Sequence, residues 1–127
     1  MPMLRKDPIA GRWVIIAPER AERPRAYERE ATKQAAGLCP FCAEHEDSTP
    51  ETVATYEAVD DQQPWSVRVV PNKFPALTRQ GERRVDTDGV YEGMQGVGAH
   101  EVIIESPTHV TNLSELPAEH IGRVLQA

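Results

Sequence analysis

The stretch GAHEVIIESPTHVTNLSEL (residues 98–116) joins a strand, a loop and the approach to a helix. Residues 102–104 form a continuous apolar run, Val-Ile-Ile, which is typical of a strand buried on both faces. His109 follows in the loop, where its side chain is placed to reach across to another loop. Residues 112–127 then predict a helix, with Pro117 in the first turn and apolar residues recurring at i, i+3 and i+4.

The segments before this stretch predict further strands. Residues 4–16 read as a hairpin whose turn is Asp-Pro-Ile-Ala-Gly, and residues 51–59 and 65–70 read as two more strands. Residues 78–98 are rich in Gly, Asp and Arg, which predicts a loop with a short hairpin. Residues 19–37 are highly charged without a helical apolar period, so we expect an exposed, irregular arm.

Length and charge narrow the classes of function. The 127 residues favour a single domain, and the net charge is −6, from 14 basic and 20 acidic residues. An acidic chain does not suit a nucleic acid, whose phosphates need clustered cations, although one or two arginines suffice for a mononucleotide. No apolar run approaches the ~18 residues of a membrane span. The chain stops inside its last periodic segment, so we expect it to be the N-terminal part of a longer domain.

The stretch GLCPFCAEHEDSTPE (residues 37–51) holds the two cysteines of the chain, Cys39 and Cys42. Two thiolates at this spacing converge on one tetrahedral Zn²⁺ from a tight turn. A redox pair is the alternative, but the acidic residues that follow oppose a thiolate. Inert thiols remain a third interpretation. The other ligands would be carboxylates or histidines, and the histidines of the chain are His45, His100, His109 and His120. With no secretory signal, a reducing cytoplasmic location is expected.

Five segments, taken in order, resemble the galactose-1-phosphate uridylyltransferase family of the histidine-triad superfamily. They are DPIAGRWVIIAPERAERP, CPFC, VRVVPNKFPAL, GAHEVIIESPTHVTNLSEL and the helix after them. The resemblance implies an α+β fold, a mostly antiparallel sheet with helices on one side, of which residues 1–127 are the N-terminal part. It also implies a homodimer for the full-length protein.

The resemblance implies a structural zinc held by Cys39, Cys42 and His109. The fourth ligand in that family is a histidine just before the catalytic histidine pair, beyond residue 127. His45 is the rival to His109. If the ligand set closed within this chain, the alternative would be a non-enzymatic zinc-binding module.

The reaction of the family exchanges a uridylyl group between UDP-glucose and galactose 1-phosphate through a uridylyl-histidine intermediate. Its nucleophile lies in a His-Pro-His motif, and this chain contains no His-x-His. The chain alone is therefore expected to be inactive. Relatives in the superfamily transfer adenylyl groups instead, and these residues do not discriminate between the two bases.

The part expected of this chain is substrate binding. The resemblance assigns Arg20 and Arg23 to the phosphates of the nucleotide sugar, and guanidinium forks suit phosphate oxygens. It assigns Asn72 and Lys73 to the segment that cradles the nucleoside. The alternatives are a solvated charge run for the arginines and a turn-forming role for Asn72. His100 is expected to cap a strand, and His120 is expected to be exposed on the helix.

Overall fold

The computed structural model describes residues 1–22 and 39–127. The predicted irregular arm lies mostly outside these residues. The chain divides into two compact units: unit 1 comprises Met1–Ala26 and Phe74–His100, and unit 2 comprises Tyr27–Lys73 and Glu101–Ala127. Among the described residues each unit contains one antiparallel sheet and few helices, so the fold is α+β, as the resemblance implies.

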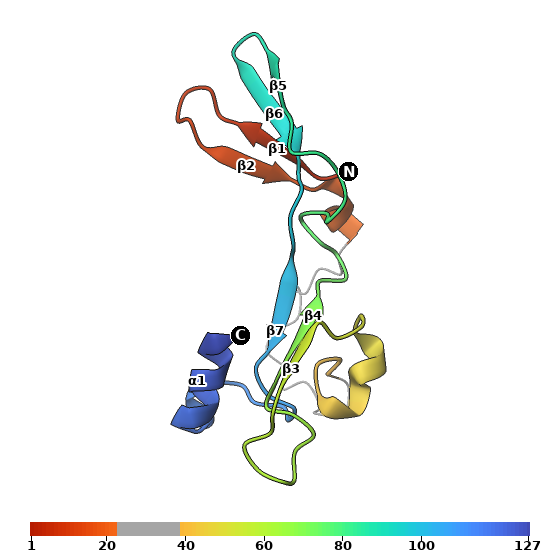
Figure 1. Cartoon of the computed structure of the whole chain (residues 1–127), viewed down its shortest axis with the longest axis vertical. Helices are drawn as coiled ribbons and strands as arrows, with labels where there is room; N and C mark the ends of the chain where they lie inside the picture. The colour runs from red at the N-terminus through yellow and green to blue at the C-terminus, as the bar shows by residue number, and fades with distance from the viewer. Residues whose placement is uncertain (23–38) are drawn as a thin grey trace. The chain divides into compact units, whose positions relative to one another are not determined.

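Unit 1 contains a four-stranded sheet with the strand order β2-β1-β6-β5 (Figure 1). Its strands are β1 (Met3–Lys6), β2 (Trp13–Ile16), β5 (Val85–Asp88) and β6 (Tyr91–Gln95). The 3₁₀ helix η1 (Pro18–Glu22) follows β2. The central pair, β1 and β6, brings Met3 opposite Gln95, so the two ends of this unit's sequence are joined by backbone hydrogen bonds.

The first hairpin forms as predicted, because Asp7 organises its turn. The Asp7 backbone N–H donates to the Arg12 carbonyl at 2.8 Å, and its Oδ1 accepts from the N–H groups of Ile9 and Ala10 at 2.8 and 3.2 Å. Gly11 adopts a φ of +69°, in the left-handed region that favours glycine. The second hairpin, β5–β6, has Gly89 in its turn at a φ of +62°. Residues 78–98 thus contain the short hairpin that their composition predicts.

Unit 2 contains a three-stranded sheet with the order β3-β4-β7. The strands are β3 (Ala54–Tyr56), β4 (Val67–Pro71) and β7 (Glu101–Ile104). All three predicted strands are therefore present. The pair β4–β7 places Val70 opposite Val102 and Arg68 opposite Ile104.

The most buried strand is β4, and the prediction of a doubly buried β7 is wrong. Val67 and Val70 are 0% and 1% exposed, whereas Ile103 in β7 is 42% exposed. The reason is the strand order, since β4 is central and β7 lies at the edge of the described sheet. The core of unit 2 is built from Trp65, Val70 and Ile104.

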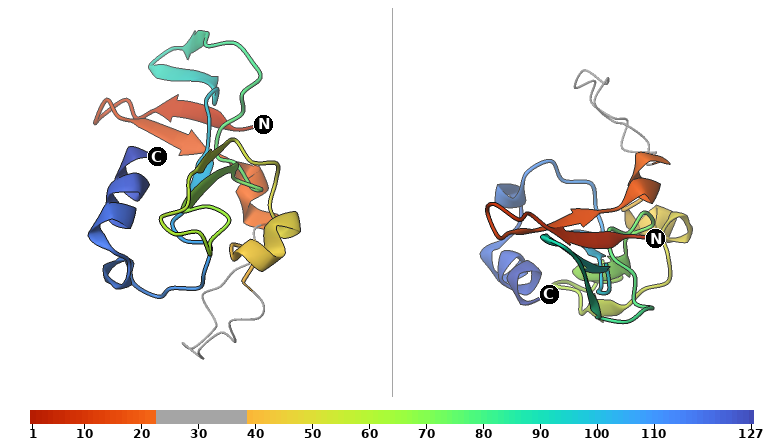
Figure 2. Two further views of the ribbon diagram at one scale, coloured as in Figure 1. Left: turned by 60° about the horizontal axis from the view of Figure 1, so that its bottom comes forward. Right: turned by 90° about the horizontal axis from the view of Figure 1, so that it is seen from above.

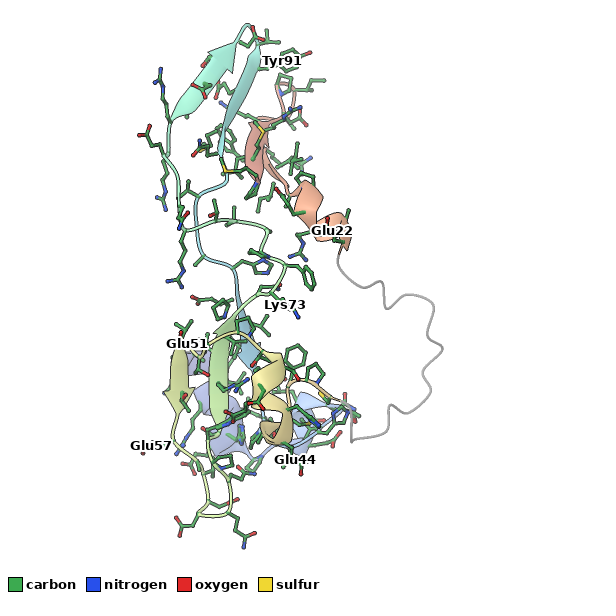
Figure 3. All side chains as sticks on the ribbon, turned by 90° about the vertical axis from the view of Figure 1, so that its right-hand side faces the viewer. Glu22, Glu44, Glu51, Glu57, Lys73 and Tyr91 are labelled. Carbon is green, nitrogen blue, oxygen red and sulfur yellow. The ribbon has the colours of Figure 1, made fainter. Side chains whose placement is uncertain are left out.

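The resemblance implies helices on one side of the sheet, whereas two helices of unit 2 lie on opposite faces of its sheet (Figure 2). The α-helix α1 (Ala118–Gln126) covers one face, and the 3₁₀ helix η3 (Ala43–Ser48) covers the other (Figure 2). Figure 3 views the sheet from the η3 side, with Glu44 on that helix and α1 behind the strands. A short 3₁₀ helix, η4 (Leu113–Glu115), precedes α1. No helix in residues 1–22 or 39–127 has the length and apolar character needed to cross a membrane.

Candidate functional site

The cysteine loop is folded by its own backbone. The Cys42 N–H donates to the Cys39 carbonyl at 3.3 Å, and the His45 N–H donates to the Cys42 carbonyl at 2.9 Å. These successive tight turns bring both thiols to the same side of the loop, as the C-x-x-C spacing predicts.

A second loop, after β7, supplies His109. The Ala43 N–H donates to the Pro107 carbonyl at 2.9 Å, which joins this loop to the cysteine loop. Ser106 is buried, and its hydroxyl accepts from the Thr108 N–H at 3.2 Å, forming a local turn. The turn directs the following residue, His109, toward the cysteines.

Cys39, Cys42 and His109 converge in unit 2. Their ligand atoms all lie within 4.8 Å of one another, and Cys42 Sγ is 3.9 Å from His109 Nδ1. Tetrahedral Zn²⁺ with its usual bond lengths separates two sulfur ligands by about 3.8 Å, and a sulfur from a nitrogen ligand by about 3.6 Å. Two thiols and an imidazole at these distances fit three corners of a zinc site. These are the three residues that the family resemblance implies as metal ligands.

The raised pKa of the Cys42 thiol argues against a reactive, redox-active cysteine. Burial raises the pKa of the Cys42 thiol, and the neighbouring Cys39 and the charge of Glu44 act in the same direction. A raised pKa leaves the free thiol protonated and a poor nucleophile at neutral pH. A metal ion displaces that proton when it binds.

The metal cluster opens onto a pocket of about 400 Å³. The residues that line it include Cys39, Cys42 and His109, together with the apolar residues 102–104 of β7. An open position beside three ligands leaves room for a fourth group to approach. In the part of the chain that the structure describes, no fourth His, Cys, Asp or Glu joins the cluster.

His45, the rival ligand, does not belong to the cluster of the described residues. Its Nδ1 is buried and has no hydrogen-bond partner among them. Its backbone conformation, with φ of −127° and ψ of 31°, departs from the helical values inside η3. The geometry therefore favours His109.

The helix η3 is attached to β4 by a group of polar side chains that the sequence reasoning missed. Arg68 is 3% exposed, and its guanidinium lies 3.1 Å from the Glu46 carboxylate and donates to the Thr49 hydroxyl. The guanidinium carbon is 5.6 Å from the ring centroid of Trp65. An arginine inside the apolar run WSVRVV was the available signal, because a buried arginine requires an acidic partner.

Arg20, the predicted phosphate ligand, lies at η1 in unit 1 and is half-buried. Its Nη1 donates to the Phe74 carbonyl at 2.9 Å and lies 3.3 Å from His100 Nδ1. His100 Nδ1 also accepts from the Ala76 N–H at 2.9 Å. His100 therefore packs against a predicted substrate-binding arginine and does more than cap a strand.

The other predicted substrate residues lie elsewhere. Arg23 is outside the described residues. Asn72 and Lys73 follow β4 in unit 2, where Asn72 is half-buried and the Lys73 side chain is exposed (Figure 3). The expectation for His120 is wrong, because its side chain is 3% exposed and its Nε2 donates to the Glu105 carbonyl at 2.6 Å.

The chain matches known proteins over its whole length. The family model described as "Galactose-1-phosphate uridyl transferase, N-terminal domain" matches residues 1–127. ADP-glucose phosphorylase of Arabidopsis thaliana is 36% identical, with 99% of this chain and 37% of the relative aligned. Galactose-1-phosphate uridylyltransferase of Haemophilus influenzae is 27% identical, with 98% of this chain and 35% of the relative aligned.

Solved structures give the same result. The crystal structure of an ADP-glucose phosphorylase from Arabidopsis thaliana with bound ADP-glucose superposes with a TM-score of 0.51 at 35% identity, covering 98% of this chain and 35% of that one. A structure of uridylyltransferase superposes with a TM-score of 0.58 at 26% identity, covering 98% and 32%. The chain thus spans about a third of the length of these relatives. With this match over residues 1–127, the chain belongs to the galactose-1-phosphate uridyl transferase family, of which it is an N-terminal domain.

Proposed function

We propose that this chain is the N-terminal portion of a nucleotidyltransferase that cleaves a nucleoside diphosphate glucose. The observation that carries the proposal is the match to the family over residues 1–127, together with the convergence of Cys39, Cys42 and His109. Both similar proteins bear the names of enzymes whose substrates contain a phosphorylated sugar. The proposal includes the homodimer and the cytoplasmic location that the sequence analysis expects.

The metal cluster has a structural role in this proposal. Cys39, Cys42 and His109 hold a zinc ion, which when bound cross-links the cysteine loop to the loop after β7. A side chain from beyond residue 127 completes the coordination through the open pocket. The residues on both loops are thereby held in fixed positions at the end of β7.

Substrate binding is assigned to the arginines and to the segment after β4. Arg20 and Arg23 bind phosphate oxygens, because a guanidinium presents paired donors at the spacing of two phosphate oxygens. Asn72 hydrogen-bonds the ribose, since its amide both donates and accepts, and Lys73 belongs to the same segment that cradles the nucleoside. A few basic side chains are thus sufficient for substrate binding, although the net charge of the chain is negative.

The covalent step belongs to a histidine that this chain does not contain. In the proposed reaction that histidine attacks the α-phosphorus, so that a nucleotidyl-histidine forms and glucose 1-phosphate leaves. An acceptor then takes the nucleotidyl group and regenerates the imidazole. The contribution of residues 1–127 is to bind and orient the nucleotide sugar.

Two substrate pairs fit this chemistry. The uridylyl reaction consumes UDP-glucose and galactose 1-phosphate and produces glucose 1-phosphate and UDP-galactose. The adenylyl reaction consumes ADP-glucose and inorganic phosphate and produces glucose 1-phosphate and ADP. The identity to ADP-glucose phosphorylase is 36%, against 27% for the uridylyltransferase, and this supports testing the adenylyl pair alongside the uridylyl pair.

Turnover assays with the full-length protein test the proposal. Glucose 1-phosphate release is measured from ADP-glucose with phosphate and, separately, from UDP-glucose with galactose 1-phosphate. We expect one pair to be preferred by at least about tenfold in kcat/KM, because a base pocket that pairs one set of polar groups leaves them unpaired with the other base. Release from neither pair would refute the proposed function.

A further inference from the structure

The guanidinium of Arg20 is fixed by one of its two terminal nitrogens. Nη1 donates to the Phe74 carbonyl at 2.9 Å and lies 3.3 Å from Nδ1 of His100. These contacts span 54 and 80 positions of sequence, and all three residues belong to unit 1. Arg20 is therefore held by the tertiary fold, unlike the freely rotating arginine of an exposed charge run.

The contacts of His100 Nδ1 define the hydrogen-bonding role of that nitrogen. Its Nδ1 faces two groups that only donate hydrogen bonds, the Ala76 backbone N–H at 2.9 Å and the Arg20 guanidinium. A proton on Nδ1 would point at both donors, one of them cationic. Nδ1 of His100 thus serves as an acceptor between the arginine and the turn at Ala76.

The other edge of the Arg20 guanidinium is left for a ligand. Two acceptors engage Nη1, while in residues 1–22 and 39–127 no protein group bonds to Nε or Nη2. The Nε–Nη2 edge carries two parallel N–H donors, which is the geometry of bidentate binding to a phosphate or carboxylate. In the same residues Arg20 forms no ion pair with a carboxylate, because its two Nη1 partners are a backbone carbonyl and an imidazole nitrogen.

We infer that His100 is a positioning residue for Arg20, which it orients so that the Nε–Nη2 edge faces a phosphate of the nucleotide sugar. The inference rests on the proposed function, and it assigns a role to a histidine that lies outside the metal cluster. His100 does not touch the substrate in this assignment. It acts through Arg20, and through the Ala76 N–H it also fixes the turn whose Phe74 carbonyl is the second acceptor.

Two variants of the full-length protein distinguish the hydrogen-bond acceptor of the His100 side chain from its volume, and a third serves as a control. His100→Asn keeps an acceptor near Nδ1, whereas His100→Leu retains side-chain volume without one. We expect Leu to raise the Kd for the preferred nucleoside diphosphate glucose about 3- to 10-fold, the range for losing one hydrogen bond, and Asn to stay within about twofold of the unsubstituted protein. The Kd for the corresponding nucleoside, which has no phosphate, should not change with Leu. Arg12→Ala, an exposed arginine of unit 1, controls for loss of general positive charge.

A double-mutant cycle tests whether His100 acts through Arg20. Arg20→Ala should weaken binding by at least about tenfold, and adding His100→Leu should then cause no further loss, since the group it orients is gone. Additive losses, or an equal loss of nucleoside affinity, would overturn the positioning role while leaving the proposed function intact. No effect of Arg20→Ala would instead remove Arg20 from the phosphate site, and the inference with it.

The unsubstituted protein provides a measurement that does not depend on how the variants fold. Nitrogen-15 NMR of the His100 ring should show an unprotonated, hydrogen-bonded Nδ1 and a protonated Nε2 at neutral pH. A protonated Nδ1 would contradict the inference, because His100 could then not accept from Arg20.

Discussion

The indole N–H of Trp65 donates to the Glu46 carboxylate at 2.5 Å, across nineteen positions of sequence. Trp65 precedes β4, whereas Glu46 lies on η3, in the loop that begins with the two cysteines. The other carboxylate oxygen of Glu46 lies 3.1 Å from the buried guanidinium of Arg68. One acidic side chain therefore joins the cysteine loop to the central strand of unit 2, and this fixes the direction from which the thiols approach His109.

Glu46→Ala should destabilise the protein and weaken its metal site. The substitution leaves Arg68 and the Trp65 indole without their acceptor, at a cost of about 1–3 kcal/mol, because Glu46 is partly exposed and the pair is not fully desolvated. Urea unfolding of the full-length protein at a constant m-value measures the change. Asp47→Ala, an exposed neighbour on η3, is the control and should stay within about 0.5 kcal/mol. Equal effects of the two variants would show that Glu46 does not hold the loop.

Zinc affinity should depend on the three converging residues. Cys39→Ser, Cys42→Ser and His109→Ala should each lower it by at least about 100-fold, because each removes a direct ligand. His45→Ala should change it only a few-fold, since His45 lies outside the cluster. Competition titration with a chromophoric chelator measures the affinities in the full-length protein. Loss of binding in His45→Ala, with binding retained in His109→Ala, would reverse the assignment.

His120 should contribute to stability through its position between α1 and the end of β7. Its Nε2 donates to the Glu105 carbonyl at 2.6 Å in a buried setting, so His120→Ala should cost about 1–3 kcal/mol in chemical denaturation. His120→Gln, which keeps a terminal N–H donor, should recover part of the loss. The matched control is Leu125→Ala on the same helix, where the side chain is 80% exposed. A cost for His120→Ala no larger than that of the control would contradict the role.

The carboxyl of Glu115 should make the stability of the protein depend on pH. The Thr111 hydroxyl donates to Glu115 Oε1 at 2.7 Å, and together with the backbone N–H of Asn112 it holds the pKa of that carboxyl below its usual value. A lowered folded pKa means that the stabilisation is present above the unfolded pKa and is lost as pH falls through the folded value. Carbon-13 NMR titration should give a midpoint below the ordinary glutamate value, moving upward in Thr111→Val. A midpoint at or above the ordinary value would contradict the hydrogen bond.

Local signals made much of this fold predictable. The hydrogen bonds of the turn Asp7–Gly11 join residues that are close in sequence, so the first hairpin can be predicted from the local sequence. The cysteine spacing likewise determines a local turn, and the family resemblance supplies His109 as the third ligand. Pro117 marks the start of α1 because it lacks an N–H and sits where the helix does not need one.

Non-local relationships were not predictable in this way. An apolar run such as residues 102–104 indicates a strand but not whether that strand is central or at an edge, so β4 rather than β7 is the buried one. The pairing of β1 with β6 joins segments some ninety residues apart and leaves no periodic signature. The contacts of His100 and His120 depend on the tertiary fold, and no spacing in the sequence reveals which carbonyl or N–H a histidine will meet.

The most direct test of the central claim is intact-mass spectrometry of the full-length protein mixed with ADP-glucose or UDP-glucose in the absence of an acceptor. A nucleotidyltransferase with a histidine nucleophile should gain the mass of one nucleotidyl group, release glucose 1-phosphate in equal amount, and lose the added mass when phosphate or galactose 1-phosphate is supplied. Arg20→Ala should slow formation of the adduct. Unchanged mass with both nucleotide sugars, in a protein that binds zinc through Cys39, Cys42 and His109, would contradict the account.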